Sequence, residues 1–389
     1  MSEGALPRGT RLLHIGLPKT GTTSIQYAAH TQRQLLGRHG VVYPGRELNH
    51  NRQVSAAIGR VSELWAEPPS VYEWHALLRE LRARPGDRAL ISYEQLTEAS
   101  PRGARRLVRA LGRRRTHVVI TVRALGTLLP SVWQQYVKTG YSGRFDTWAA
   151  DMLADPPRLG GTPSFWIRHD ATAQLAKWIR AAGRDRVTVV IPDGARPEVL
   201  TNAFERMLDL PEGLLRVAMD DGYGANRSLS GTEAEIVRRL NARLDGREVP
   251  LGQYNRYVTQ GAVARVQRHA AADVDDGRVR LPPELAPRVM QLQQQFADRL
   301  ERSGVRVIGD RSQLIAAPAT GADDVASTIE TRTAAEFVLG MISRIVHRGI
   351  EFGDLEYLPP VPVDLDEIER FRLSRHIRQR LRGEEHRVG

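Results

Sequence analysis

The feature that most constrains this chain is a glycine-punctuated turn near its N-terminus. Residues 11–15 are mostly apolar, the turn runs from Gly16 to Gly21, and residues 22–38 continue without proline. In a strand–turn–helix unit of this kind, backbone N–H groups and the positive end of the helix dipole can hold a phosphate. Further donors in or beside the turn are the side chains of Lys19, Thr20, Thr22, Thr23 and Ser24. The sequence therefore predicts an anion site for a nucleotide.

The order of residues in the turn separates two kinds of phosphate-binding loop. Nucleoside triphosphatases use G-x-x-x-x-G-K-[ST], in which lysine directly follows the second glycine. Gly16 and Gly21 have that spacing, but Thr22 follows Gly21 and Lys19 lies two residues before it. This order argues against an ordinary ATP or GTP hydrolase. A plain tight turn with a capping threonine stays an alternative.

Alternation of short β-branched runs with helical patterns in the first half indicates an α/β fold, a parallel sheet flanked by helices. Strands are predicted over residues 12–16, 88–93, 117–122 and 187–192. Helices are predicted over residues 22–38, 71–84, 102–112, 125–139, 171–182, 197–208, 231–244 and 283–303. Small polar residues over 316–327 predict a linker between a main domain, 1–315, and a helical C-terminal extension, 328–389.

Charge and composition narrow the function classes. The chain has a net charge of +11 and contains no cysteine, so disulfides and thiolate chemistry are excluded. The densest arginine cluster spans residues 102–115; without interleaved aromatic residues it favours a solvated helix face over a nucleic-acid site. The N-terminus lacks the apolar core of a signal peptide and no apolar stretch reaches membrane-spanning length, so a cytoplasmic location is expected.

The turn sequence Pro-Lys-Thr-Gly-Thr-Thr, residues 18–23, resembles the 5′-phosphosulfate loop of sulfotransferases that use 3′-phosphoadenosine 5′-phosphosulfate (PAPS). The resemblance implies a P-loop NTPase-like parallel sheet. It also implies that the loop binds the cofactor through Pro18, Lys19, Thr20, Gly21, Thr22, Thr23 and Ser24. Lys19 would neutralise charge on the leaving phosphate.

Two further segments match the same family. Arg123 follows the third predicted strand, and Ser131 lies eight residues later, which is the spacing with which sulfotransferases hold the 3′-phosphate. A guanidinium pairs with phosphate oxygens through two parallel hydrogen bonds. Glu94 follows the second strand in a segment similar to the Ser-Ser-Glu-x-Leu type, although Tyr93 replaces the second serine. Glu94 is predicted to be the general base; capping of a helix that begins near Leu96 is its alternative.

Three weaker candidates complete the predicted site. Asn226 and Ser228 lie in a polar segment similar to the one that closes over the adenosine in this family, although capping of the next helix explains that segment equally well. His14, two residues before the turn, and His50, before a predicted helix, compete with Glu94 for the role of base. No cluster of histidines or carboxylates has the spacing of metal ligands, and sulfuryl transfer needs no metal ion.

The predicted function is therefore transfer of a sulfuryl group from PAPS to a hydroxyl or amine of a carbohydrate, lipid or small molecule. An atypical nucleotide kinase and a non-catalytic nucleotide-binding protein stay as alternatives. Neither a nucleic-acid partner nor a transmembrane segment is expected. The acceptor cannot be read from the sequence, and a homo-oligomer stays open.

Overall fold

The computed structural model describes residues 4–60, 67–158, 162, 164–218, 227–245, 247, 249–269, 278–321 and 331–345. The chain forms two compact units, each built from separate segments. The first contains Met1–Leu129, Asp151–Met219 and Pro283–Thr320, and the second contains Pro130–Ala150, Asp220–Pro282 and Gly321–Gly389. No described helix is both long enough and apolar enough to cross a membrane.

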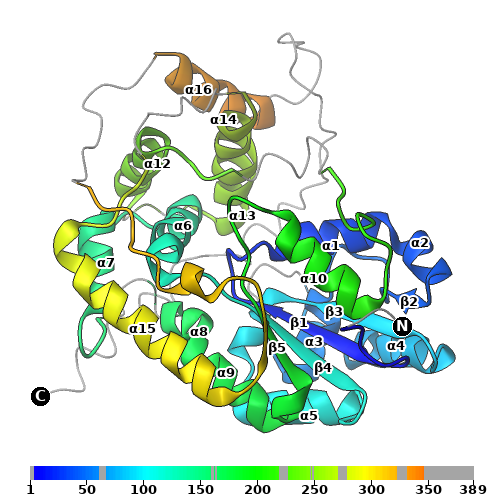
Figure 1. The fold of residues 1–389 in the computed structure, drawn as a ribbon. Coiled ribbons are helices and arrows are strands. Elements are labelled where there is room, and N and C mark those ends of the chain that lie inside the picture. The colour runs from blue at the N-terminus through cyan, green and yellow to red at the C-terminus, as the bar shows by residue number, and fades with distance from the viewer. Residues whose placement is uncertain are drawn as a thin grey trace, which may run out of the picture. The chain divides into compact units, whose positions relative to one another are not determined.

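The first unit is built on a six-stranded sheet in the order β2-β3-β1-β4-β5-β6, in which every neighbouring pair is parallel (Figure 1). The strands are β1 (Arg11–Gly16), β2 (Val41–Val42), β3 (Arg88–Ser92), β4 (Thr116–Thr121), β5 (Val187–Val190) and β6 (Arg306–Ile308). The predicted α/β fold class is confirmed. Because β1 lies between β3 and β4, their carboxyl ends meet at one edge of the sheet, where ligands bind in folds of this class.

Both faces of the sheet are covered by helices (Figure 1), so the strands are buried on both sides. This explains why their sequences are continuous apolar runs. Leu13 and Ile15 of β1 point into one hydrophobic cluster, together with Trp178. Leu12 points into the opposite cluster, together with Phe204. Successive strand residues face opposite sides, so β1 contributes to two separate cores and has no solvent-exposed face.

Most predicted helices of the first unit are present, but those over residues 51–58 and 165–169 are not among the predicted ranges. In the first unit they are α1 (Thr22–Thr31), α2 (Arg33–Arg38), α3 (Asn51–Ile58), α4 (Val71–Ala83), α5 (Pro101–Ala110), α8 (Phe165–His169), α9 (Ala171–Ala182), α10 (Glu198–Leu208) and α15 (Ala286–Ser303). Short helical turns are η1 (Glu94–Glu98), η2 (Arg184–Arg186), η4 (Pro283–Leu285) and η5 (Arg311–Leu314). The helix predicted over 22–38 is two helices, because the first ends at Thr31 and the second begins at Arg33.

The second unit is helical in its described part. Its helices are α12 (Gly231–Leu244), α13 (Leu251–Tyr254), η3 (Asn255–Val263), α14 (Ala264–His269) and α16 (Thr331–Ile345). Helix α6 (Leu125–Lys138) begins in the first unit and ends in the second, and α7 (Phe145–Leu153) begins in the second and ends in the first. Of the predicted linker and C-terminal extension, residues 316–321 and 331–345 are described.

Helix α16 packs against the segment 255–269 through two glycines. A Cβ atom on Gly340 would lie 2.7 Å from Ala262 Cα and 2.7 Å from Gly261 O. Arg265 also pairs with Glu336 at 2.7 Å. The described helix of the C-terminal extension is thus part of the core of the second unit.

This contact makes Gly340→Ala an informative substitution. Alanine normally stabilises a helix interior relative to glycine by up to about 1 kcal/mol. Here its methyl group has no space, so we expect the free energy of unfolding to fall by about 1–3 kcal/mol. Gly252→Ala on α13 is the matched control, since no heavy atom lies within 4 Å of its Cβ position. Equal unfolding free energies for the two variants in urea titrations would contradict the packing of α16.

Candidate functional site

The predicted phosphate loop joins the end of β1 to the start of α1 in an unusual backbone conformation. Lys19 and Gly21 have φ angles of 70° and 90°. Positive φ is ordinary for glycine but uncommon for lysine, so surrounding contacts must hold Lys19 in this conformation. Helix α1 begins without a side-chain cap and without an acidic residue in its first turn. Its first N–H groups and its dipole therefore favour an anion at this end.

The end of β4 anchors the loop. Leu17 N donates to Thr121 O at 3.1 Å, and the hydroxyl oxygens of Thr20 and Thr121 are 2.6 Å apart. Arg123, two residues after β4, donates from Nη1 to Lys19 O at 3.0 Å. The guanidinium of Arg123 is therefore fixed beside the residue that carries the loop's amino group.

Gly16 and Thr22 bring the two ends of the loop together. A Cβ atom at Gly16 would lie 2.0 Å from Thr22 Oγ1, so only glycine permits this approach. The Thr22 hydroxyl is buried, and no residue in the described part of the chain hydrogen-bonds to it. A buried hydroxyl without a partner costs free energy, and at the start of a helix it is a donor suited to an anion.

Beneath the loop, hydroxyl and ring nitrogen atoms form a chain whose proton directions can be assigned. Thr20 Oγ1 donates its one proton to Leu17 O at 2.6 Å, so Thr121 must supply the proton between the two threonines. Thr121 Oγ1 therefore accepts from His14 Nε2, 3.4 Å away. His14 Nδ1 then carries no proton, and it accepts from Ser92 Oγ at 2.9 Å.

Gln26 extends this chain to Glu94. Its Nε2 donates to Ser92 Oγ at 3.1 Å and to Glu94 Oε2 at 3.2 Å. Gln26 is 2% exposed and lies on α1, the helix that the loop begins. The carboxylate of Glu94 is thus connected to the floor of the phosphate loop by a continuous series of hydrogen bonds.

Glu94 is the first residue of η1, directly after β3. Tyr93 occupies the N-cap position and no side chain makes a capping hydrogen bond, while Glu94 is the acidic residue of the first turn. The helix-terminus alternative for Glu94 therefore stays open as a dipole interaction. Burial lowers the pKa of the Lys19 amino group, and the negative charge of Glu94 opposes this effect. Electrostatics thus couples Lys19 and Glu94, as expected of residues at adjacent strand ends.

Ion pairs and hydrogen bonds to backbone carbonyls fix the end of η1. Glu98, its last residue, accepts from Arg60 and from Arg168 at 2.7 Å each. Lys177 Nζ donates to Thr97 O at 2.6 Å and to Ala99 O at 3.0 Å. These contacts fix the C-terminal end of η1, while its first residue, Glu94, follows β3 directly.

His14 and His50 are both buried, and both ring nitrogens of each are engaged. Burial lowers the pKa of His14 to about 3. His50 Nδ1 accepts from Ser92 N at 3.1 Å, so its Nε2 carries the proton and donates to Pro44 O at 3.0 Å. Burial lowers the pKa of His50 to about 4. Both rings are neutral in the structure, and their hydrogen bonds hold the carboxyl ends of β1 and β3 in place.

A third buried histidine, His169, was not singled out by the sequence. Its Nδ1 lies 2.8 Å from Phe165 O, which can only accept, so Nε2 is the unprotonated nitrogen. Nε2 is buried and has no hydrogen bond to any described residue. Burial lowers the pKa of His169 to about 4, and the charges of Arg168 and Lys19 contribute. His169 is therefore a neutral ring within the electrostatic field of Lys19.

The remaining predicted residues, Ser131, Asn226 and Ser228, belong to the second unit. Ser131 is in α6 and Ser228 precedes α12, both in the second unit, and Asn226 lies outside the described residues. Arg227 pairs with Glu233 at 2.6 Å, and Gln134 bonds to both N and O of Leu229. Ser230 and Glu233 form a capping box at the start of α12. Capping of this helix, one of the two explanations given for the segment, is thus present.

Sequence reasoning missed three residues that organise the site: Gln26, Ser92 and Thr121. Two of them end strands, Ser92 in β3 and Thr121 in β4. A search for polar residues at strand carboxyl ends would have found both. Gln26 carries no such signal, because a polar residue in a helix is ordinarily exposed.

Comparison with known proteins gives a structural similarity and no match to a family model or a curated protein. Among solved structures, the chain is similar to a sulfotransferase from Alicyclobacillus acidocaldarius, with 15% sequence identity and a TM-score of 0.38. The match covers 62% of this chain and 95% of that one. Similarity at this level does not carry the neighbour's properties over to this chain.

The buried histidines predict a dependence of stability on pH. The pKa of His50 is depressed to about 4 from an ordinary 6.5, so below pH 6.5 the unfolded chain binds a proton that the folded chain does not. The free energy of unfolding should therefore fall as the pH drops from 6.5 to 4. His50→Gln should make that slope shallower by up to about 1.4 kcal/mol per pH unit.

Urea titrations between pH 4 and pH 7 measure this slope. The control is His75→Gln, which makes the same substitution at an exposed histidine on α4, and its slope is compared with that of His50→Gln. An unaltered slope in His50→Gln would show that His50 is not a buried neutral ring.

Proposed function

We propose that this protein transfers a sulfuryl group from PAPS to a hydroxyl or amine of a carbohydrate, lipid or small-molecule acceptor. The supporting observation is the placement of two cationic side chains at one loop, with Arg123 hydrogen-bonded to the backbone of Lys19. Two such cationic groups match a donor that carries phosphate groups at both its 5′ and 3′ positions. The start of α1, which has no side-chain cap, supplies N–H donors at the same loop.

The residues present fit this donor chemically. The unpartnered hydroxyl of Thr22 and the N–H groups of Thr22 and Thr23 are suited to phosphate oxygens. The lysine lies within the turn, before Gly21, and not after it as in nucleoside triphosphatases. This position favours the sulfotransferase function over the kinase alternative.

In the proposed mechanism PAPS supplies the sulfuryl group, and the chain's own residues position the reactants and stabilise charge. The amino group of Lys19 neutralises negative charge that develops on the leaving phosphate. Arg123 holds the 3′-phosphate through its guanidinium. The hydroxyls of Thr20 and Thr121 keep the loop in the required conformation.

Glu94 takes the proton from the acceptor in this mechanism. Gln26 occupies Oε2 of the carboxylate, and Oε1 makes no hydrogen bond to a described residue. Oε1 is therefore available as the proton-accepting oxygen. His14 and His50 have no ring nitrogen free for this role, so we assign them to positioning the strand ends that carry the loop and Glu94.

Arg123→Ala tests recognition of the donor. Loss of a charged hydrogen bond should weaken binding of 3′-phosphoadenosine 5′-phosphate by roughly 1.5–3 kcal/mol, which raises Kd about 10-fold to 150-fold. Adenosine 5′-phosphosulfate lacks the 3′-phosphate, so its Kd should hardly change. Isothermal titration calorimetry measures both values, with Arg113→Ala as a charge-matched control. Equal losses for both nucleotides would contradict the assignment of Arg123.

Glu94→Gln tests the base. Glutamine keeps the shape of the side chain but cannot accept the proton, so sulfuryl transfer should slow by about 10²–10⁴-fold. Nucleotide affinity and melting temperature should stay near wild type. The rate is measured by transfer of labelled sulfate from PAPS to an acceptor identified in a cell extract.

Three histidine variants, His14→Gln, His50→Gln and His169→Gln, provide the comparison. Each should retain more activity than Glu94→Gln. If Glu94→Gln transfers sulfate normally while His169→Gln is inactive, the base is His169. Binding of the nucleotide without transfer to any acceptor would favour the non-catalytic alternative.

A further inference from the structure

A second basic site lies at the opposite edge of the sheet from the phosphate loop. A cavity of about 670 Å³ is lined by the segments that precede or begin β1, β4, β5 and β6. All four segments belong to the first unit. Because the strands are parallel, this edge holds their amino ends and the phosphate loop lies at their carboxyl ends. The six residues of β1 separate the two edges by about 20 Å, at about 3.3 Å per residue.

Each of the four strands brings at least one arginine to this cavity. The six lining arginines are Arg8, Arg114, Arg115, Arg184, Arg186 and Arg306. The lining includes a single carboxylate, that of Asp185, which lies 3.3 Å from Arg184 Nε. None of the other five arginines forms an ion pair with a carboxylate in the described part of the chain. Hydrogen bonds from Arg8 and Arg306 go to backbone carbonyls, those of Gly86 and Gly4.

The positive charge affects neighbouring groups. His117 also lines the cavity, and its pKa is lowered to about 4 by burial and by the charges of Arg306 and Arg186. Burial and the charges of Arg115 and Arg82 lower the pKa of Arg11. Like charges brought together without counter-charges are unfavourable. An anion in the cavity would relieve this repulsion.

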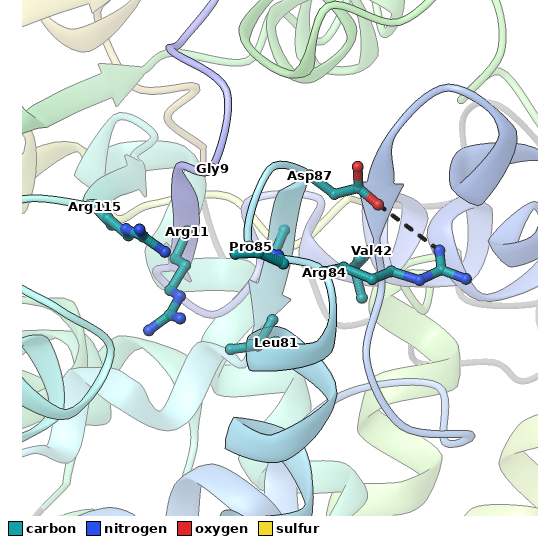
Figure 2. Close-up of a pocket in the computed structure, with 9 residues that line it drawn as sticks. Gly9, Arg11, Val42, Leu81, Arg84, Pro85, Asp87 and Arg115 are labelled. Atoms are coloured by element: carbon teal, nitrogen blue, oxygen red, sulfur yellow. Dashed lines mark ion pairs between the residues drawn. The ribbon is translucent and has the colours of Figure 1, made fainter.

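A neighbouring small cavity provides a contrast. It has a volume of about 10 Å³ and shares Gly9 and Arg115 with the larger one. Figure 2 shows that Arg84 at this small cavity faces the carboxylate of Asp87, at an N–O distance of 3.9 Å. Arg84 thus has a carboxylate partner at the small cavity, whereas five of the arginines of the large cavity have none in the described part of the chain.

The arginine cluster of residues 102–115 divides at this edge. Four of these arginines lie on α5 and are exposed: Arg102, Arg105, Arg106 and Arg109. Arg106 also donates a hydrogen bond to Ala57 O. Arg114 and Arg115 lie beyond the helix, directly before β4, and line the cavity. The predicted solvated helix face accounts for the first group, but it does not account for the second.

The size and lining of the cavity indicate its ligand. A volume of about 670 Å³ lies within the range of small-molecule sites. Its lining contains no Phe, Tyr or Trp on which a nucleobase could stack. Guanidinium groups from several directions match phosphate or sulfate oxygens. We propose that this cavity binds a compact, non-aromatic small molecule that carries several phosphate or sulfate groups.

This inference does not depend on the proposed function, and its test separates the two. Inositol hexakisphosphate is the probe, titrated calorimetrically at fixed ionic strength into the full-length Lys19→Met variant. That background lacks the amino group of the phosphate loop but keeps all six cavity arginines. We expect saturable binding of one molecule per chain.

The double variant Arg186→Gln/Arg306→Gln in the same background should raise Kd at least roughly tenfold, because two guanidinium contacts are lost. Arg105→Gln/Arg109→Gln on α5 removes the same charge away from the cavity and should change Kd less than about twofold. If the variant Arg186→Gln/Arg306→Gln has a lower melting temperature than the Lys19→Met background, the single substitution Arg114→Gln is used for the same comparison. Arg114 is exposed and also lines the cavity.

Three results would overturn the proposal. One is no binding to the Lys19→Met variant. Another is an equal loss of affinity in the α5 control pair, which would show a diffuse electrostatic field and no built site. The third is tighter binding of a single-stranded oligonucleotide of the same charge, which would indicate a nucleic-acid surface.

Discussion

The candidate site depends on the hydrogen bonds made by the hydroxyl of Thr121. This hydroxyl lies 2.6 Å from Thr20 Oγ1 and 3.4 Å from His14 Nε2, while the carbonyl of the same residue accepts from Leu17 N. Through these contacts the end of β4 holds the loop that leaves β1. The positive φ of Lys19 is sustained by this frame and by the Arg123 hydrogen bond to its carbonyl. Preorganisation of this kind lets donors act on charge without rearrangement.

The same frame connects the loop to Glu94. Ser92 and Gln26 carry the hydrogen-bond series from His14 to the carboxylate, and the last link starts on α1, the helix that begins at the loop. A displacement of α1 would therefore move both the N–H groups at its start and the hydrogen bond from Gln26 to Glu94. Buried polar groups linked in this way fix each other's positions, because leaving any one of them unpaired is costly.

Local patterns in the sequence predicted much of the fold, and contacts between distant segments could not be predicted. The strands around Leu12 and Val118 have continuous apolar runs, and the turn from Gly16 to Gly21 has an explicit glycine signal. Strands β2 and β6 contain only two and three residues, too few for a pattern. His14 bonds to a residue 78 positions away and His50 to one 42 positions away. Only the strand order makes those residues neighbours, and sequence periodicity does not give the strand order.

We propose that the phosphate loop binds a nucleotide with phosphates at both the 5′ and 3′ positions. Calorimetric titration of the full-length wild-type protein with 3′-phosphoadenosine 5′-phosphate and, separately, with ATP and Mg²⁺ tests this proposal. We expect 3′-phosphoadenosine 5′-phosphate to bind at least roughly tenfold more tightly, a difference of about 1.4 kcal/mol. Tighter binding of ATP with Mg²⁺ would refute the proposal and favour a kinase.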